Sequence, residues 1–283
     1  MEAAAAIRRG LKPGVVLNSL ALAVFVLVIL VPFWWIASMS FKTYEQIQFA
    51  TSIYIPNPFT LENYSDLWNA TGFPVWFRNS MVTASAVTAI TIVISALAAY
   101  AVARLRFPGR ALMASVVLIL YLVPPALMFI PLYRVLSALG ATDSLAALIL
   151  AYPTFTVPFC TWLLIGFFKA VPIELEEAAL VDGANRWLAF TRIILPLVVP
   201  GLVASAIFAF TLSWNEFLYA LVMIQDGAAM TVPVGLNLLI YGDVFDWGQL
   251  MAGSVITTLP VVVLYMFVVR WMVEGMTAGA VKG

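Results

Sequence analysis

The chain has 283 residues, of which 64% are hydrophobic and 10% are charged, with 14 basic and 14 acidic side chains and no net charge. An ordinary soluble protein is about half apolar and a quarter charged, so a water-soluble fold is excluded. A bilayer accommodates this much apolar surface because it acts as an apolar solvent. A neutral chain without a long basic run also argues against nucleic acid as a partner. The composition therefore indicates an integral membrane protein.

The positions of the charges predict where the chain crosses the membrane. A helix needs about 20 consecutive apolar residues to span the hydrocarbon. The long runs without Asp, Glu, Lys or Arg, one of them extended past Glu216, predict an all-α protein with six transmembrane helices in a single transmembrane domain, 1–283. The predicted helices are 15–39, 77–103, 111–134, 144–168, 197–224 and 249–272. A seventh run, 227–242, is short and contains Pro233 and Gly235, so we predict a loop or re-entrant segment there.

The basic residues predict the orientation, because short cytoplasmic loops of membrane proteins are rich in Lys and Arg. With the N-terminus inside, Lys42, Arg78 and Arg134 lie outside, and every other Lys and Arg lies in a cytoplasmic segment. Both termini are therefore predicted to be cytoplasmic. The first helix is predicted to be retained, because its apolar run is too long for a signal peptide and no small-residue cleavage site follows it.

Several chemistries are absent from the sequence. The chain has no histidine, which excludes His-based metal sites and Ser-His hydrolysis, and its one cysteine, Cys160, lies in an apolar stretch and predicts a core residue. It also lacks a Gly-x-x-x-x-Gly-Lys-Ser/Thr loop for ATP. We therefore predict that this chain is not an enzyme and holds no cofactor of its own. A secondary transporter driven by an ion gradient is the alternative, although Glu216 is the one acid well inside a predicted span.

The longest cytoplasmic loop, 169–196, has its own predicted structure. Pro172 can start a helix, acidic residues follow near its positive end, and Gly183 can end it with a positive φ. A second helix is predicted from about Asn185 to Leu195. Small residues on the first helix would let another protein approach closely. The same pattern is equally compatible with an amphipathic helix that packs on lipid headgroups.

The residues of this loop carry a family resemblance. Glu177-Ala178-Ala179, Asp182-Gly183-Ala184 and Ile194-Leu195-Pro196 resemble the EAA loop of permease subunits in binding-protein-dependent ABC importers. Segments 103–109, 214–217 and 279–283 are similar to the carbohydrate-uptake branch with maltose-type permeases. The resemblance covers nearly the whole chain and implies the type I ABC importer permease fold.

The resemblance also implies partners and sites. It implies a second homologous permease subunit, two ATPase subunits that bind ATP and Mg, an extracytoplasmic sugar-binding protein, and a place in the inner membrane among its lipids. The residues implied to dock on the ATPase are Glu177, Ala178, Ala179, Asp182, Gly183, Ala184 and Arg186. The C-terminal tail, 275–283, is implied to insert between the ATPase subunits through Gly279, Val281, Lys282 and Gly283, although ordinary fraying of a chain end gives the same polar pattern.

Two predicted sites remain open between alternatives. Trp214, Asn215 and Glu216 could face the translocation path and bind a sugar, or Glu216 could be a buried acid bonded to the partner permease. Tyr241, Asp243 and Trp247 lie in the last outer segment, which the resemblance suggests reaches toward the binding protein. Anchoring of aromatic rings at the membrane interface explains Tyr241 and Trp247 equally well.

Overall fold

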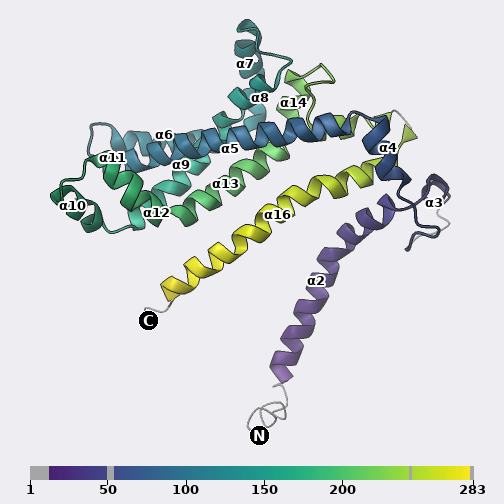
Figure 1. Cartoon of the computed structure of the whole chain (residues 1–283), viewed down its shortest axis with the longest axis horizontal. Coiled ribbons are helices and arrows are strands. Elements are labelled where there is room, and N and C mark those ends of the chain that lie inside the picture. Colours follow the sequence, from purple (N-terminus) through teal and green to yellow (C-terminus); the bar gives the residue numbers. More distant parts are fainter. Residues whose placement is uncertain (1–12, 50–53, 242–243, 281–283) are drawn as a thin grey trace. The chain divides into compact units, whose positions relative to one another are not determined.

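The computed structural model describes residues 13–49, 54–241 and 244–280, and this part of the chain is almost entirely helical (Figure 1). The prediction of an all-α membrane protein is confirmed. The first half contains α2 (Pro13–Ser40), α3 (Tyr44–Gln48), α4 (Glu62–Ala70), α5 (Phe73–Arg104), α6 (Arg110–Leu122), α7 (Pro125–Ala138) and α8 (Leu145–Ala151). The second half contains α9 (Pro153–Ala170), α10 (Ile173–Val181), α11 (Arg186–Ala189), the π-helical turn η1 (Phe190–Ile194), α12 (Leu195–Leu197), α13 (Val199–Trp214), α14 (Leu218–Met223), α15 (Val232–Asn237), two-residue strands β1 (Ile240–Tyr241) and β2 (Val244–Phe245), and α16 (Trp247–Ala280).

Among the described residues, four helical segments are long and apolar enough to cross a membrane. They are Leu17–Ser40, Phe73–Arg104, Leu145–Ala170 and Trp247–Phe267. Two bent pairs of helices also pass this test when each pair is taken together, which raises the number of spans to six. The short run around α15 is not among them, because α15 has only six residues and packs against α5. The chain is thus a multi-pass membrane protein.

Prolines cause both bends. Helices α6 and α7 meet at 98°, where Pro124 and Pro125 follow each other and remove two backbone donors. The segment Arg186–Leu197 meets α13 at 76°. Pro200 enters the first turn of α13 there, and its ring would clash with the carbonyl of the residue four positions earlier in a continuous helix. The predicted span 197–224 also differs at its far end, because α13 stops at Trp214 and α14 is a separate short helix.

The chain divides into two compact units. The larger unit contains Thr71–Asp243 and Ile256–Gly283. In it the long helix α5 runs beside α9 and α13, and α6 lies against α9 (Figure 1). Buried side chains of α5, α9 and η1, among them Tyr100, Phe168 and Phe190, form one core cluster. This cluster lies at the end of α5 where α10, α11 and α12 gather.

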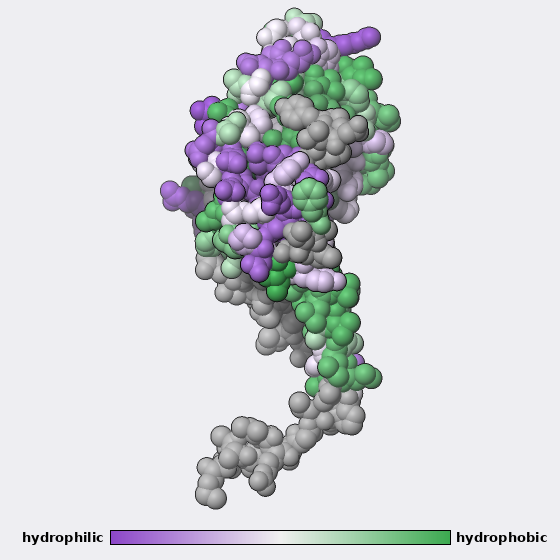
Figure 2. Space-filling model, turned by 90° about the vertical axis from the view of Figure 1, so that its right-hand side faces the viewer, coloured by the Kyte–Doolittle hydropathy of each residue, from purple (hydrophilic) through white to green (hydrophobic). Residues whose placement is uncertain are grey.

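The smaller unit contains Met1–Ala70 and Val244–Val255. The segment after α2 is organised by polar contacts: Asn63 Nδ2 donates to the carbonyls of Ser40 at 2.9 Å and Lys42 at 2.7 Å, and Ser40 Oγ lies 2.7 Å from Tyr64 Oη. Figure 2 shows hydrophilic residues gathered over α3 and α4, and hydrophobic residues covering α2. This pattern is typical of a polar cap at the end of a membrane-spanning helix.

Candidate functional site

The predicted docking loop is a rigid helix–turn–helix at one end of α5 (Figure 1). Pro172 precedes α10, and Glu174 and Glu176 lie in its first turn, where carboxylates favour the positive end of the helix dipole. Gly183 follows the helix with φ of +91°. Ala184 N–H donates to the Ala179 carbonyl at 3.0 Å, and Gly183 N–H donates to the Leu180 carbonyl at 3.2 Å. These bonds form a Schellman turn, so the predicted helix end at Gly183 is confirmed.

The second half of the loop begins with a helix that is capped by a side chain. The Asn185 side chain accepts a hydrogen bond from Leu188 N–H at 2.8 Å and caps the start of α11. From there α11, η1 and α12 continue with no break until the bend before α13. The turn between α10 and α11 is thus hydrogen-bonded on both sides, which favours transmission of motion through the loop.

Most of the predicted docking residues lie on the outer surface of this loop. Glu177, Ala178, Asp182, Gly183 and Arg186 are exposed, Ala184 is half-buried and Ala179 is buried against the protein. Their positions therefore leave one face of α10 and its turn open to a partner.

Large apolar side chains share this face. Val181 is 87% exposed and Trp187 is 63% exposed, and Leu180 is also on the surface. Apolar side chains of this size gathered with charged neighbours at a loop tip are typical of a protein or membrane contact.

A buried glutamate on the inner face of α10 bonds this helix to α5. Glu176 is 6% exposed. Tyr100 Oη on α5 donates to Glu176 Oε1 at 2.6 Å, and Arg104 Nε lies 3.9 Å from Glu176 Oε2. Tyr100, Arg104 and Glu176 are called the Glu176 anchor below. It connects α10 to the end of α5.

Arg104 also connects the anchor to α9. Its Nη2 donates to the carbonyls of Phe168, at 2.7 Å, and Val171, which lie at the end of α9. The pair Arg104 Nε and Glu176 Oε2 has no hydrogen-bond partner in the part of the chain that the structure describes. A small approach of α10 to α5 would convert this 3.9 Å ion pair into a hydrogen bond. The anchor therefore links any displacement of α10 to both α5 and α9.

No local sequence pattern distinguishes Glu176 from its acidic neighbours. Three glutamates occupy Glu174–Glu177, and all of them fit the first turn of a helix. Glu176 lies three residues before Ala179, so the two share the inner face of α10, and the small size of Ala179 is the one signal of that face. The partner Tyr100 is 76 residues away along the chain, which no local pattern reveals.

A polar cleft of about 630 Å³ lies beside the anchor. Its lining comes from α10, from α11 and from the segment that leads out of α5: Arg104, Leu105, Arg106, Phe107, Ile173, Glu176, Glu177, Leu180 and Arg186. Three guanidinium groups and two carboxylates thus border one opening. Such a mixed charge pattern suits polar groups of a partner better than an apolar ligand.

The second predicted site, Trp214 to Glu216, has its side chains directed to different places. Trp214 is 1% exposed; its Nε1 donates to the Thr257 carbonyl at 3.1 Å and its ring stacks on Phe210. Asn215 is exposed, and its side chain donates to the Thr211 carbonyl at 2.8 Å. Trp214 thus packs α13 against α16, and Asn215 is the exposed member of the three. Their predicted role in the translocation path stays a prediction.

Glu216 caps the short helix α14. Its Oε1 accepts from Tyr219 N–H at 2.9 Å, and its Oε2 accepts from Ala220 N–H at 3.1 Å and from Tyr152 Oη at 2.8 Å. All of these contacts are within this chain. They account for a charge at this depth, because each carboxylate oxygen is bonded where water is scarce.

We expect Glu216→Gln to destabilise the permease by about 1–3 kcal/mol, because an amide nitrogen cannot accept the bonds that Oε2 accepts. Tyr152→Phe removes the donor of one of these bonds. Thermal stability in detergent is measured for both single variants and for the double variant. The two effects should be non-additive, since the groups are in contact. Additive effects would contradict the role of Tyr152–Glu216 as a single stabilising unit.

The remaining predicted residues are only partly covered. Gly279 lies in the last turn of α16, while Val281, Lys282 and Gly283 lie outside the described residues, as does Asp243. Trp247 begins α16 and borders a small acidic cleft of about 220 Å³ in the smaller unit, with Glu62, Asp66 and Asp246. This cleft is polar and suits hydroxyl or amide groups.

Comparison with known proteins identifies the family. Residues 91–278 match the family model described as the binding-protein-dependent transport system inner membrane component. The chain belongs to this family of permeases. The predicted resemblance is thereby confirmed, and the alternative of a secondary transporter is left without support. A permease of this family is not by itself an enzyme.

Relatives match this permease over almost its whole length. It is 36% identical to the inner membrane ABC transporter permease protein YcjP of Escherichia coli over 93% of this chain and 94% of that protein. It is 39% identical to the trehalose/maltose transport system permease protein MalG of Thermococcus litoralis over 91% and 93%. The trehalose transport system permease protein SugB of Mycobacterium tuberculosis is 37% identical over 90% and 93%.

A solved structure confirms the fold. The permease superposes with a TM-score of 0.78 on a chain of a bacterial ABC transporter involved in the import of the acidic polysaccharide alginate. The match covers 90% of this chain and 95% of that chain at 20% sequence identity. At this identity the likeness establishes the ABC importer permease fold and nothing more specific.

Proposed function

We propose that this permease is the membrane subunit of an ATP-driven importer of an oligosaccharide or other small glycoside. Relatives at 37% and 39% identity support the sugar class, since MalG is named for trehalose and maltose and SugB for trehalose. A further relative, DasC of Streptomyces coelicolor, is 34% identical and is named for diacetylchitobiose uptake. Two homologous permease subunits would form the path and open it alternately to each side.

The observation that carries the energy-coupling part of this proposal is the exposed, rigid face of α10 above the Glu176 anchor. The face presents Glu177, Ala178, Asp182, Gly183 and Arg186 to a partner. A separate ATPase subunit that binds ATP and Mg would dock on it. Since the helix is joined to α5 and α9 through the anchor, motion of the ATPase would reach the membrane helices without loss in a flexible loop.

The other assignments follow from the same proposal. Both termini lie in the cytoplasm, and the polar surface over α3 and α4 faces the opposite side, where a sugar-binding protein docks. The tail that ends in Val281, Lys282 and Gly283, with Gly279 before it, inserts between two ATPase subunits. Asn215 borders the path, and the buried Trp214 and the internally bonded Glu216 hold the chain beside it. The acidic cleft at Trp247 belongs to the face that meets the binding protein.

A purification tests the assembly. The permease is tagged, extracted from its native membrane in mild detergent and isolated with its bound proteins. We expect a second permease subunit and an ATPase to co-purify, and sugar uptake by proteoliposomes with the binding protein to require ATP. A permease that purifies alone and transports sugar on a proton or sodium gradient would refute the proposal.

A further inference from the structure

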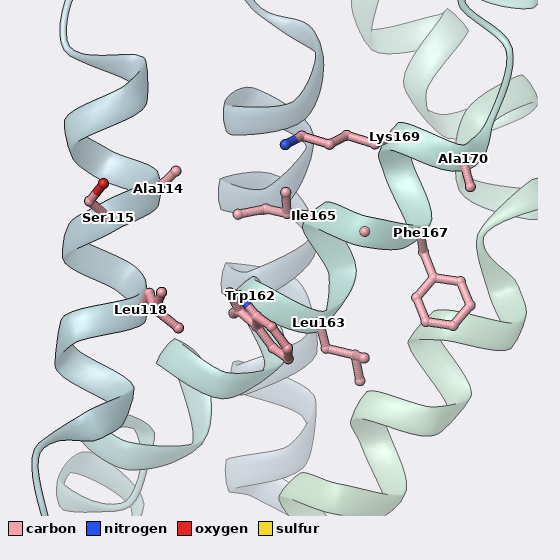
Figure 3. Close-up of a pocket in the computed structure, with 10 residues that line it drawn as sticks. Ala114, Ser115, Leu118, Trp162, Leu163, Ile165, Phe167, Lys169 and Ala170 are labelled. Atoms are coloured by element: carbon pink, nitrogen blue, oxygen red, sulfur yellow. The ribbon is translucent and has the colours of Figure 1, made fainter.

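A groove between α6 and α9 is separate from the predicted docking face and from the predicted sugar path. It has a volume of about 690 Å³, within the range of small-molecule sites. Figure 3 shows the groove between the two helices. Its lining consists of Ala114, Ser115 and Leu118 on α6 and Trp162, Leu163, Ile165, Gly166, Phe167, Lys169 and Ala170 on α9.

The shape of the groove follows from residue size. Ala114 and Gly166 leave the space between α6 and α9 open, whereas Trp162 and Leu118 lie at the end of the groove away from Lys169. Trp162 precedes Lys169 by seven residues, so the groove extends about 10 Å along α9 from the lysine into the hydrocarbon region. Nearly all of this surface is apolar, which fits part of an acyl chain.

One cation lies at the mouth of this apolar groove. Lys169 is exposed, and its side chain extends from α9 toward α6 across the end of the groove (Figure 3). Its amine forms no hydrogen bond or ion pair within residues 13–49, 54–241 and 244–280. Arg110 lies one turn before Ala114 on the same face of α6, with its guanidinium bonded to the carbonyls of Val102 and Ala103. The mouth is therefore positively charged.

We propose that this groove binds an anionic phospholipid of the cytoplasmic leaflet, with an acyl chain between α6 and α9 and the phosphate at Lys169. The site goes beyond the proposed transport function and rests on the cytoplasmic position of Lys169. Basic pockets between membrane helices on the cytoplasmic side are suited to acidic headgroups. A helix of the second permease is a poorer occupant, because an apolar helix would bury the amine of Lys169 without a countercharge.

The test compares retained lipid on the purified complex by native mass spectrometry, with phosphatidylglycerol and phosphatidylethanolamine as probes. We expect the unaltered complex to retain phosphatidylglycerol in preference. Lys169→Gln should lower its retention about five-fold, since one basic residue is lost near the headgroup. Gly166→Leu should lower retention of both lipids by filling the groove; a Cβ at Gly166 meets nothing within 4 Å, so the helix tolerates it.

The control is Arg192→Gln, which removes one exposed cation on η1 outside the groove and should leave lipid retention unchanged. Equal retention by Lys169→Gln and the unaltered complex would refute the proposal. Efficient disulfide cross-linking of Ser115→Cys to a cysteine on the second permease in the membrane would also refute it, because the groove would then be a subunit interface. Each variant is checked for bound ATPase, so loss of lipid is distinguished from failure of the transport proposal.

Discussion

Glu176→Ala is expected to uncouple ATP hydrolysis from sugar uptake. The substitution removes the bond from Tyr100 Oη to Glu176 Oε1 and leaves Arg104 buried beside an empty position. A hydrogen bond to a charged group contributes roughly 1.5–3 kcal/mol, so the docked orientation of α10 should be lost in most complexes and uptake should fall about ten-fold or more. Uptake and ATPase activity are both measured in proteoliposomes that contain the sugar-binding protein.

The ratio of the two activities separates this role from simple loss of folding. A misfolded loop would remove the ATPase and abolish both activities, whereas a loosened anchor should retain the ATPase and lower uptake more than hydrolysis. Tyr100→Phe removes one bond of the anchor and should give a smaller effect of the same kind. Glu174→Ala is the control, since Glu174 is exposed in the same helical turn. Unchanged uptake by Glu176→Ala would show that the anchor does not transmit the motion.

Gly183→Asp is expected to prevent the ATPase from docking while the permease still inserts in the membrane. Gly183 has a φ of +91°, which costs an L-residue about 1–2 kcal/mol, and the new carboxylate would project from the exposed turn beside Asp182. No atom lies within 4 Å of a Cβ at this position, so a clash inside the permease does not contribute. The amount of ATPase that co-purifies with the tagged permease measures the effect.

The chain provides a matched control for the strain. Gly140 has a φ of +65°, and no atom lies within 4 Å of a Cβ built there. It ends α7 with the same Schellman pattern as Gly183, in which Ala141 N–H donates to the Leu136 carbonyl and Gly140 N–H donates to the Ser137 carbonyl. Gly140→Asp therefore adds a similar backbone strain and the same charge at a different helix end. We expect it to retain the ATPase. Equal loss of ATPase in both variants would attribute the effect to strain instead of docking.

Much of the architecture could be predicted because it depends on local chemistry. Runs of apolar residues bounded by Lys and Arg mark the spans, since the thickness of the bilayer fixes their length. Pro172 and Gly183 mark the ends of α10, because proline at a helix start lacks only an N–H that would have no partner there and glycine tolerates the positive φ that ends a helix. The bends were not predicted, although the pair Pro124–Pro125 and Pro200 are visible in the sequence. An uninterrupted apolar run hides a change of helix direction.

The two candidate sites differ in how far the sequence could define them. The predicted docking loop is continuous in the chain, so its residues, such as Glu177 and Asp182, could be named from spacing and resemblance. For Trp214 and Glu216 the sequence was compatible with two roles, one in the translocation path and one in the packing of the protein. Their partners are Thr257, Tyr152 and two backbone amides, which fold against them from other parts of the chain or from the next helix.

The amino-acid sequence was sufficient to predict a membrane protein, its resemblance to importer permeases, and the residues at which α10 begins and ends, because each of these depends on neighbouring residues. Tertiary structure alone decided which of three similar glutamates is buried. Glu174 and Glu177 are exposed, whereas Glu176 meets Tyr100 and Arg104 on α5. The reason is physical: burial of a carboxylate requires a donor and a countercharge, and here both come from a helix far away in the chain.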